Sequence, residues 1–344
     1  MRPALEQLYL KLPLTSPVIV GACPLTMQPE MVRQFCTAGV GAVVFPSIFQ
    51  EQLERSPEFW DEPHPSQELA PFEQSYNGGP DRYLETIRQV RQTIAVPIIA
   101  SMNGYAAGSW LTFAKQLEAS GADALELNFQ PIATSPEQSA GELENQLCDM
   151  VHSVCQSVSL PVAVKVSRHH ACPANIVHRL KQVGAAGVVL FAHEVKWRVD
   201  ADRLQWTPHW ELTPVDSTAS TLSGLIQAQM GVAGISVAAS GGIRTADDAI
   251  KMLIAGADVV MITSELYRSG PVAIQRVTQG LEHYLSQKGF VSLADLRQAR
   301  PRIAQRTEPT VRSDYLNPLT QSERYPDPTP VPPQQTGDRF GHPH

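Results

Sequence analysis

Short apolar runs alternate along this chain with longer stretches whose apolar positions recur at helical spacing. The short runs are rich in β-branched residues and do not alternate strictly between apolar and polar positions. Continuous runs of this kind are typical of parallel strands covered on both faces, and they predict a sheet flanked by helices. Eight of them stand out, at residues 17–22, 41–46, 96–101, 123–128, 161–166, 187–192, 235–240 and 258–263.

The stretches between the runs carry the helical pattern, as in residues 109–120, 136–157 and 245–255. Several runs begin directly after a glycine that ends the preceding helix, and others follow a proline or glycine placed after a helix. Eight strand–helix units in succession favour an α/β fold closed as a (β/α)8 TIM barrel. The same alternation of strands and helices also fits an open, doubly wound sheet, which is the alternative.

Two connections are much longer than the others, residues 46–80 and 192–217, and both follow predicted strands. In a barrel they lie at the C-terminal face, where active sites form, and loops of this length there are usually lids or hairpins. We assign residues 1–300 to the barrel. Residues 301–344 form a C-terminal extension that becomes Pro-rich and polar, and we expect it to be disordered towards its end.

Composition excludes several classes of function. The chain has 344 residues, 43% of them hydrophobic, and a net charge of -7, which gives a large core but no field to attract nucleic acid or an anionic membrane. No apolar run reaches the roughly 18 residues of a membrane helix, and residues 1–17 lack the apolar segment of a secretory signal. The 5 cysteines are scattered and form no C-x-x-C pair, so neither a metal site nor a disulfide framework is indicated. We therefore expect a cytoplasmic protein.

The strongest local signal for chemistry lies in residues 238–266. The seventh predicted strand ends in Ser240-Gly241-Gly242, and the eighth ends in Thr263-Ser264. In a barrel, glycine-rich turns after these two strands present backbone N–H groups to a phosphate, because a residue without a Cβ lets the backbone approach closely. The alternative is a pair of tight turns that need glycine for their backbone angles alone.

Polar residues also follow the first five predicted strands, and together they form a ring suited to a planar heterocycle with many edge hydrogen bonds. Lys165 is the most informative of them, since it lies inside an apolar strand where a buried cation needs a partner. It either faces an electron-rich cofactor edge, forms a Schiff base, or is an outward or paired lysine. The members of the ring are Ala22, Cys23, Ser47, Asn103, Asn128 and Lys165.

These stretches resemble the FMN-dependent dihydroorotate dehydrogenase family, and most of all its dihydroorotate dehydrogenase-like branch. The likeness runs through about residues 15–300 and includes "SPVIVGACPLT", "PIIASMNG", "GADALELN", "PVAVKVS" and "AASGGIRTADDAIKMLIAGADVVMITSEL". The resemblance implies an FMN lying across the barrel mouth, with Lys165 beside the pyrimidine edge of the flavin, where a cation stabilises the reduced form. It further implies a substrate contact by Asn77 and Asn128, and cofactor contacts by Ala22, Cys23, Ser47, Asn103, Asn128, Ser240, Gly241, Gly242, Thr263 and Ser264.

The sequence departs from the family pattern in the substrate half of the site. No cysteine or matching serine follows Asn128, where the family has its catalytic base, and Thr134 and Ser135 are the only hydroxyls nearby. Pro46 stands where the family often has a lysine. After the sixth strand, Ala192-His193 replaces a substrate-binding asparagine. Thr134, Ser135 and His193 are therefore the candidate bases, and His193 has a suitable intrinsic pKa.

The resemblance predicts an FMN-dependent oxidoreductase that acts on a CH–CH group, with dihydroorotate oxidised to orotate in pyrimidine biosynthesis. The alternatives are an FMN enzyme with a different small substrate, a flavin-binding protein that has lost catalysis, and a flavin-free aldolase that uses Lys165. The partner is a small molecule, and the resemblance alone implies a homodimer. Because no membrane-associating segment precedes the barrel in this sequence, we do not expect the quinone-using, membrane-bound type, and the electron acceptor is left open.

Overall fold

The computed structural model describes residues 2–54, 76–104, 109–129, 135–214, 217–301 and 308–320. The chain divides into two compact units, Met1–Ile303 and Ala304–His344. Within the second unit the structure describes one helix, α13 (Glu308–Thr320). Most of the extension that we expect to be disordered lies outside the described residues, so that expectation stays a prediction. No helix in the described ranges is long and apolar enough to cross a membrane.

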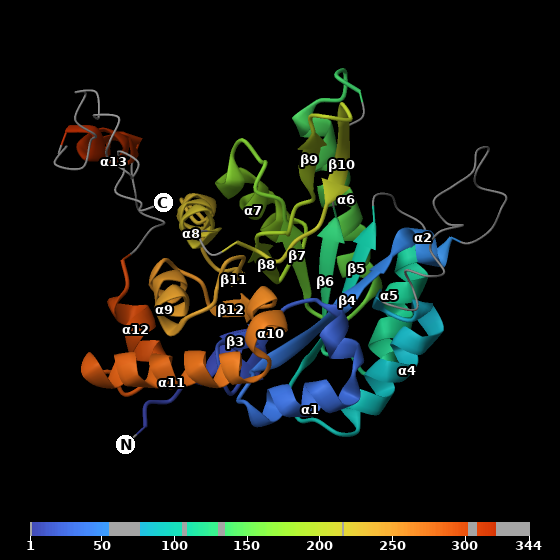
Figure 1. The fold of residues 1–344 in the computed structure, drawn as a ribbon, viewed down its shortest axis with the longest axis horizontal. Coiled ribbons are helices and arrows are strands. Elements are labelled where there is room, and N and C mark those ends of the chain that lie inside the picture. Colours follow the sequence, from blue (N-terminus) through green and yellow to red (C-terminus); the bar gives the residue numbers. More distant parts are fainter. Residues whose placement is uncertain are drawn as a thin grey trace. The chain divides into compact units, whose positions relative to one another are not determined.

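The first unit is a closed barrel of eight strands, and every pairing between neighbouring strands is parallel. Each of the eight predicted runs overlaps one barrel strand, so the (β/α)8 fold is confirmed and the open sheet is wrong. Figure 1 shows helices covering the outside of the barrel. In order around the barrel, the strands are β3 (Val18–Val20), β4 (Ala42–Phe49), β5 (Ile98–Gly104), β6 (Ala124–Phe129), β7 (Val162–Val166), β8 (Gly187–Leu190), β11 (Ser236–Ser240) and β12 (Val259–Ile262).

The helices between the strands are amphipathic and bury their apolar stripes against the sheet. Side-chain caps fix several of their starts; the Thr245 hydroxyl, for example, accepts a hydrogen bond from the Asp248 N–H. The main helices are α1 (Pro29–Thr37), α4 (Gly79–Arg91), α5 (Ser109–Ser120), α6 (Ala140–Ser157), α7 (Pro173–Gln182), α8 (Ser217–Ala228), α9 (Ala246–Ile254) and α11 (Val272–Gln287). The shorter ones are η1 (Pro24–Met27), α2 (Gln50–Leu53), α10 (Ser264–Ser269) and α12 (Leu293–Ala299).

Alternation along each strand divides the core into two layers. Outward residues such as Val18 and Val43 pack beneath the helices, whereas inward residues such as Ile19 and Val44 fill the barrel. A hairpin of β1 (Gln7–Tyr9) and β2 (Leu12–Leu14) joins the inner layer and closes the N-terminal end. The inner layer is apolar at this end, and towards the opposite end its positions become polar, at Ser101, Glu126, Lys165 and Ser240.

The second long connection, residues 192–217, contains a hairpin of β9 (Lys196–Asp200) and β10 (Gln205–His209). Figure 1 shows it projecting away from the barrel, on the side where the barrel strands end. Of the first long connection, the structure describes α2 and the residues from Tyr76 onward. Long loops that follow barrel strands, as both of these do, shape the mouth of a barrel.

Candidate active site

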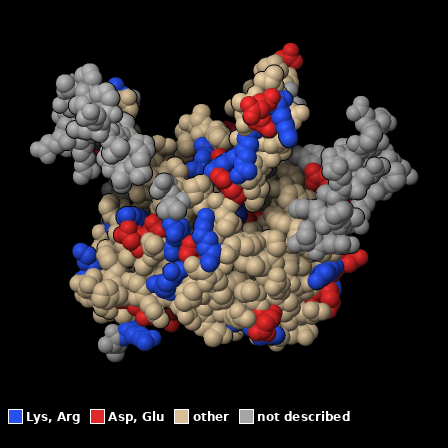
Figure 2. Space-filling view, in the orientation of Figure 1, with Lys and Arg blue, Asp and Glu red and all other residues tan. Residues whose placement is uncertain are grey.

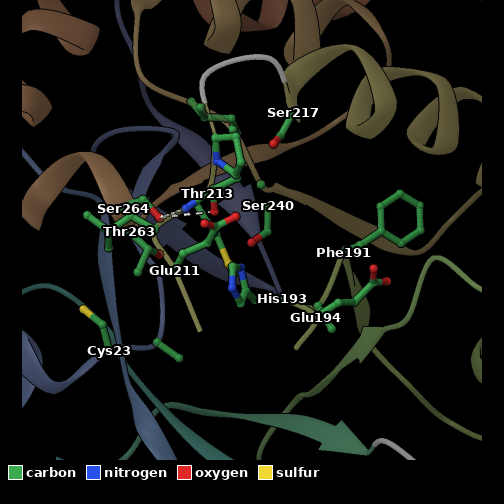
Figure 3. Close-up of a pocket in the computed structure, with 18 of the residues that line it drawn as sticks. Cys23, Phe191, His193, Glu194, Glu211, Thr213, Ser217, Ser240, Thr263 and Ser264 are labelled. Carbon is green, nitrogen blue, oxygen red and sulfur yellow. Dashed lines mark hydrogen bonds between the residues drawn. The ribbon is translucent and has the colours of Figure 1, made fainter. Parts of the chain in front are cut away.

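A cavity of about 630 Å³ opens at the C-terminal ends of the barrel strands. Figure 2 shows the hollow below the projecting hairpin. In Figure 3, His193, Ser240 and Thr263 are drawn around the same space. Nine of the residues singled out from the sequence line it, namely Ala22, Cys23, Lys165, His193, Ser240, Gly241, Gly242, Thr263 and Ser264.

Lys165 enters the cavity from an inward position of β7, two residues after Ala163 of the inner layer. Its Nζ lies 3.1 Å from Oε1 of Glu126, whose side chain is only 1% exposed. Glu126 in turn is reached by the Ser101 hydroxyl at 3.4 Å, and Ser101 contacts the Ser47 hydroxyl at 2.8 Å. A polar row therefore crosses four neighbouring strands, from Ser47 on β4 to Lys165 on β7. Lys165 is therefore a paired lysine that also lines the cavity, and its predicted contact with a cofactor stays a prediction.

Sequence analysis did not single out Glu126. The signal was available, because a carboxylate inside an apolar strand needs a partner as much as the lysine does. Its second oxygen, Oε2, is buried and has no hydrogen-bond partner among the described residues. This oxygen leaves the pair with one unused acceptor beside the cavity.

The far end of the cavity is a cradle of backbone and small side chains. Gly241 and Gly242 have φ angles of 115° and 80°, which other residues rarely adopt. A Cβ on Gly242 would lie 2.7 Å from the backbone N of Thr218, in the first turn of α8. The Thr218 hydroxyl donates to the Gly242 carbonyl at 3.0 Å and ties the turn to that helix. Glycine is therefore needed here for close approach as well as for its backbone angle.

The start of α8 turns its hydroxyl-bearing residues towards this cradle, with Ser217 and Ser220 in the cavity wall. The Thr221 hydroxyl is fully buried next to Gly241 and has no hydrogen-bond partner among the described residues. A helix N-terminus and a buried hydroxyl without a partner together favour an anion with several acceptor oxygens. This arrangement fits a phosphate group.

Three arginines around the cradle, Arg168, Arg244 and Arg268, also line the cavity. Arg168 donates to the Ser220 hydroxyl at 3.0 Å, and its guanidinium lies 5.4 Å from the centre of the Phe191 ring. Arg244 donates to Glu265 at 3.2 Å, and Arg268 donates to the carbonyl of Thr213 at 2.8 Å. Arg168 also pairs with Glu194 at 3.5 Å, and Arg268 lies 4.0 Å from the same Glu265, so carboxylates partly balance the three cations. These arginines were not predicted from the sequence, because an arginine in a turn or in a short helix carries no pattern of its own.

At the first strand, Ala22 and Cys23 form the cavity wall opposite the hairpin. Burial raises the pKa of the Cys23 thiol to about 11, with backbone hydrogen bonds acting in the other direction. The thiol is therefore protonated and a poor nucleophile at neutral pH. The structure supports Cys23 as a wall residue rather than as a reactive group.

His193 follows β8 and lies against Trp210, with the two ring centres 4.2 Å apart. Its Nε2 is buried and has no hydrogen-bond partner among the described residues. Burial lowers the pKa of His193 below its usual value, and the nearby Lys196 lowers it further. The imidazole is therefore neutral at pH 7. Lys196 itself is held by Glu211 at 2.6 Å at the foot of the hairpin.

Five predicted site residues are not part of the cavity wall. Ser47 is buried in the polar row, and Asn103 and Asn128 are register partners at the ends of β5 and β6. Asn77 is buried, and its side chain amide exchanges two hydrogen bonds with Gln52 and donates to the Ser47 carbonyl at 2.8 Å. Ser135 is exposed in a turn before α6. Their assigned roles stay predictions, and the candidate base Thr134 lies outside the described residues.

Comparisons with known proteins agree with this arrangement. The family profile of dihydroorotate dehydrogenase matches residues 213–285, which contain the cradle but not His193. The NAD-dependent dihydropyrimidine dehydrogenase subunit PreA of Escherichia coli K12 is 25% identical over 309 residues, which are 82% of this chain and 73% of that protein.

Two further relatives carry the name dihydroorotate dehydrogenase B (NAD(+)), catalytic subunit. The protein from Pyrococcus abyssi is 25% identical over 297 residues, 82% of this chain and 94% of its own length. The protein from Cutibacterium acnes is 27% identical over 214 residues, 59% of this chain and 67% of its own. The names of these relatives differ in the ring that they oxidise. The profile match, the relatives and the barrel agree in one respect: the chain is similar to the dihydroorotate dehydrogenases, which are oxidoreductases acting on CH–CH groups.

Proposed function

We propose that the chain binds FMN across the barrel mouth and oxidises dihydroorotate to orotate, or a dihydropyrimidine ring of the same class. The observation that carries this proposal is a single cavity with Lys165 at one end and the Gly241–Gly242 cradle at the other. One end offers a fixed cation, and the other offers backbone N–H groups and arginines. An elongated cofactor with a phosphate and an electron-rich ring requires this combination.

The cradle fits the phosphate of FMN. We assign its binding to the N–H groups of Gly241 and Gly242, the start of α8 and the strand-end residues Thr263 and Ser264. The ring end is assigned to Lys165, to the wall at Ala22 and Cys23, and to the strand-end amides Asn103 and Asn128. When bound, FMN supplies the two-electron acceptor for oxidation of the substrate.

Lys165 stabilises negative charge at the ring edge, and Glu126 holds its ammonium group in place. Both side chains are buried, so their interaction is screened less than a surface pair would be. The hydrogen bond from Ser101 to Glu126 fixes the carboxylate in turn. The ammonium group of Lys165 is therefore held in one position before a ligand binds. It need not move when negative charge develops on the ring.

His193 is our choice for the base that removes the substrate proton. Of the two candidate bases that the structure describes, His193 lines the cavity, whereas Ser135 is exposed in a turn. Its buried Nε2 is an acceptor in the neutral tautomer that carries its proton on Nδ1. The proton would pass from a substrate carbon to Nε2. A positioned base of this kind contributes about 10²–10⁴-fold to the rate.

The test is the absorption spectrum of the purified protein, followed by anaerobic addition of dihydroorotate or of dihydrouracil. Flavin bands that bleach with dihydroorotate support orotate formation and a place in pyrimidine biosynthesis. Bleaching with dihydrouracil alone would identify a dihydropyrimidine, and not dihydroorotate, as the substrate. A colourless protein that takes up no added FMN would overturn the cofactor assignment. Flavin bands that persist with both donors would identify a binding protein without this activity.

A further inference from the structure

The β1–β2 hairpin places one large side chain inside the barrel. Tyr9 is 1% exposed and belongs to the inner layer of the core. Strands β6, β7 and β11 contribute alanines to that layer, whereas β3, β5 and β12 contribute larger side chains; the residues are Ala124, Ala163 and Ala238 on one side and Ile19, Ile99, Val259 and Met261 on the other. Small residues leave a volume that a close-packed interior must fill. The ring of Tyr9 fits on the side where alanines line the barrel.

The register of the strands connects this hairpin to the ion pair at the cavity. From Glu126 on β6, the register partners on the next three strands are Ala163, Gly187 and Ser236. The hairpin contacts the end of this row, because the N–H of Leu10 donates to the Ser236 hydroxyl at 3.1 Å. A Cβ on Gly187 would lie 2.5 Å from the Leu10 side chain. One row of register partners therefore runs from the residue after Tyr9 to Glu126.

Two polar atoms of the barrel interior are buried without a partner among the described residues, the Tyr9 hydroxyl and Oε2 of Glu126. The first is a donor and the second is an acceptor. Burial raises the pKa of Tyr9 well above its usual value, and the charge of Glu126 raises it further, so the hydroxyl stays protonated and lies within the field of that carboxylate. A phenylalanine would fill the same space without burying a polar atom, and buried polar groups nearly always have a hydrogen-bond partner. The hydroxyl therefore needs an explanation that packing does not give.

The donors that the structure describes hold the carboxylate of Glu126 through one oxygen. Lys165 and Ser101 both donate to Oε1, at 3.1 and 3.4 Å. A carboxylate bound through one oxygen can turn about its side-chain bond, whereas a donor on the second oxygen fixes the plane of the group. A hydrogen bond to Oε2 would hold Glu126, and through it the ammonium group of Lys165, in one orientation.

We propose that Tyr9 is a positioning residue for the Glu126–Lys165 pair, and that one buried water carries the contact. The Tyr9 hydroxyl donates to the water, and the water donates to Oε2 of Glu126. A bridging water is nearly as favourable as a direct hydrogen bond, and a buried polar site is where such waters are found. The role of Lys165 at a flavin ring rests on the proposed function, but the link between Tyr9 and Glu126 does not.

A crystal structure of the full-length protein tests the contact directly. We expect one ordered water within about 3.2 Å of both the Tyr9 hydroxyl and Oε2 of Glu126. The same water should be lost from the structure of Tyr9→Phe, because one of its partners is removed. A wild-type structure with no water between these two atoms would overturn the proposal.

Urea denaturation of the flavin-free protein tests whether the two side chains are coupled. Tyr9→Phe should lower the urea midpoint of the wild-type protein. It should cause no further loss in Glu126→Leu/Lys165→Met, which has no acceptor at this position. Tyr284→Phe is the matched control, because Tyr284 is half-buried on α11, outside the barrel, and its effect should be the same in both backgrounds. A loss of equal size for Tyr9→Phe in both backgrounds would show that the hydroxyl does not act through Glu126.

The reduction potential of bound FMN tests whether the contact reaches Lys165. Tyr9→Phe should lower the potential, because a cation that is held less firmly stabilises the reduced flavin less. Tyr284→Phe should leave it unchanged. A wild-type potential in Tyr9→Phe would overturn the positioning role. A protein that takes up no FMN would count against the proposed function instead, and the crystal structure and the urea midpoints would still decide whether Tyr9 holds Glu126.

Discussion

At the scale of single residues, the ion pair between Glu126 and Lys165 has the largest predicted effect on stability. Changing Glu126 to Gln leaves a buried ammonium group without its counter-charge, and breaking such a pair costs about 3–5 kcal/mol. We expect the free energy of unfolding of the flavin-free protein, measured by urea denaturation, to fall by about 3 kcal/mol.

The double variant Glu126→Gln/Lys165→Met should recover most of that loss, because it removes both charges. Glu85→Gln is the matched control, since Glu85 pairs with Arg88 at an exposed site and should cost less than about 1 kcal/mol. An equal loss in the single and the double variant would show that the two charges do not stabilise each other in the folded protein.

The pH dependence of turnover depends on His193. The neutral imidazole is the base, and burial lowers its pKa below the usual 6.5. The plateau of kcat/KM should therefore extend below pH 6.5, and the rate should fall only as the pH drops through the lowered pKa. His193→Gln should reduce kcat about 10²-fold or more with its flavin content unchanged, whereas His209→Gln, at the foot of the hairpin, should not. A wild-type rate in His193→Gln would remove it as the base.

Sequence reasoning located residues better than it located their partners. The lysine in an apolar strand was recognised, but Glu126 was not, because the pairing is set by neighbouring strands and not by spacing along the chain. Asn77 is a similar case. The resemblance implies a ligand contact, which stays a prediction, and the structure adds hydrogen bonds to Gln52 and to the backbone of Ser47 and Gly79 that the sequence did not reveal. These partners come from segments far apart in the sequence, so spacing along the chain does not reveal them.

At the scale of elements, the eight strands were predictable because burial on both faces leaves an uninterrupted apolar run. The length of the loop after β8 indicated a lid or a hairpin, but its sequence did not reveal which. Alternation of Trp197, Val199 and the polar residues between them is the strand signal there, although Pro208 weakens it. The apolar residues of this hairpin face solvent and not the core, so their pattern did not identify them as part of a strand pair.

The turn after β11 gives a prediction at this scale. Gly242→Ala adds a Cβ in a left-handed backbone conformation, 2.7 Å from the Thr218 nitrogen. We expect it to lose FMN affinity as well as about 1–3 kcal/mol of stability. Gly231→Ala is the matched control, because Gly231 has a φ of 73° and a Cβ there would meet nothing within 4 Å. Isothermal titration of the apo-proteins with FMN separates the two effects, and equal FMN affinity in both variants would contradict the assignment of the cradle.

At the scale of the whole molecule, the two ends of the barrel differ: one holds the cavity and the other is closed. The mouth carries the polar row and the cavity, while the N-terminal end is closed by the β1–β2 hairpin and a partly buried network. In that network Gln7 donates to the Asp258 carbonyl at 2.8 Å, and Arg297 on α12 donates to both Gln7 and the Asp258 carboxylate, at 2.8 and 2.7 Å. The first and last elements of the barrel unit are thus joined through one arginine.

Changing Arg297 to Met should therefore destabilise the fold without affecting the flavin site. Burial raises the pKa of Asp258 even with Arg297 present, and loss of the arginine raises it further. A raised folded-state pKa means that the folded protein binds the proton more tightly than the unfolded chain. The penalty, about 3 kcal/mol at pH 7, should therefore shrink as the pH falls towards about 5. Urea denaturation at the two pH values and FMN titration at pH 7 check this expectation. A penalty independent of pH, or weakened FMN binding, would show that the closed end does more than hold the barrel together.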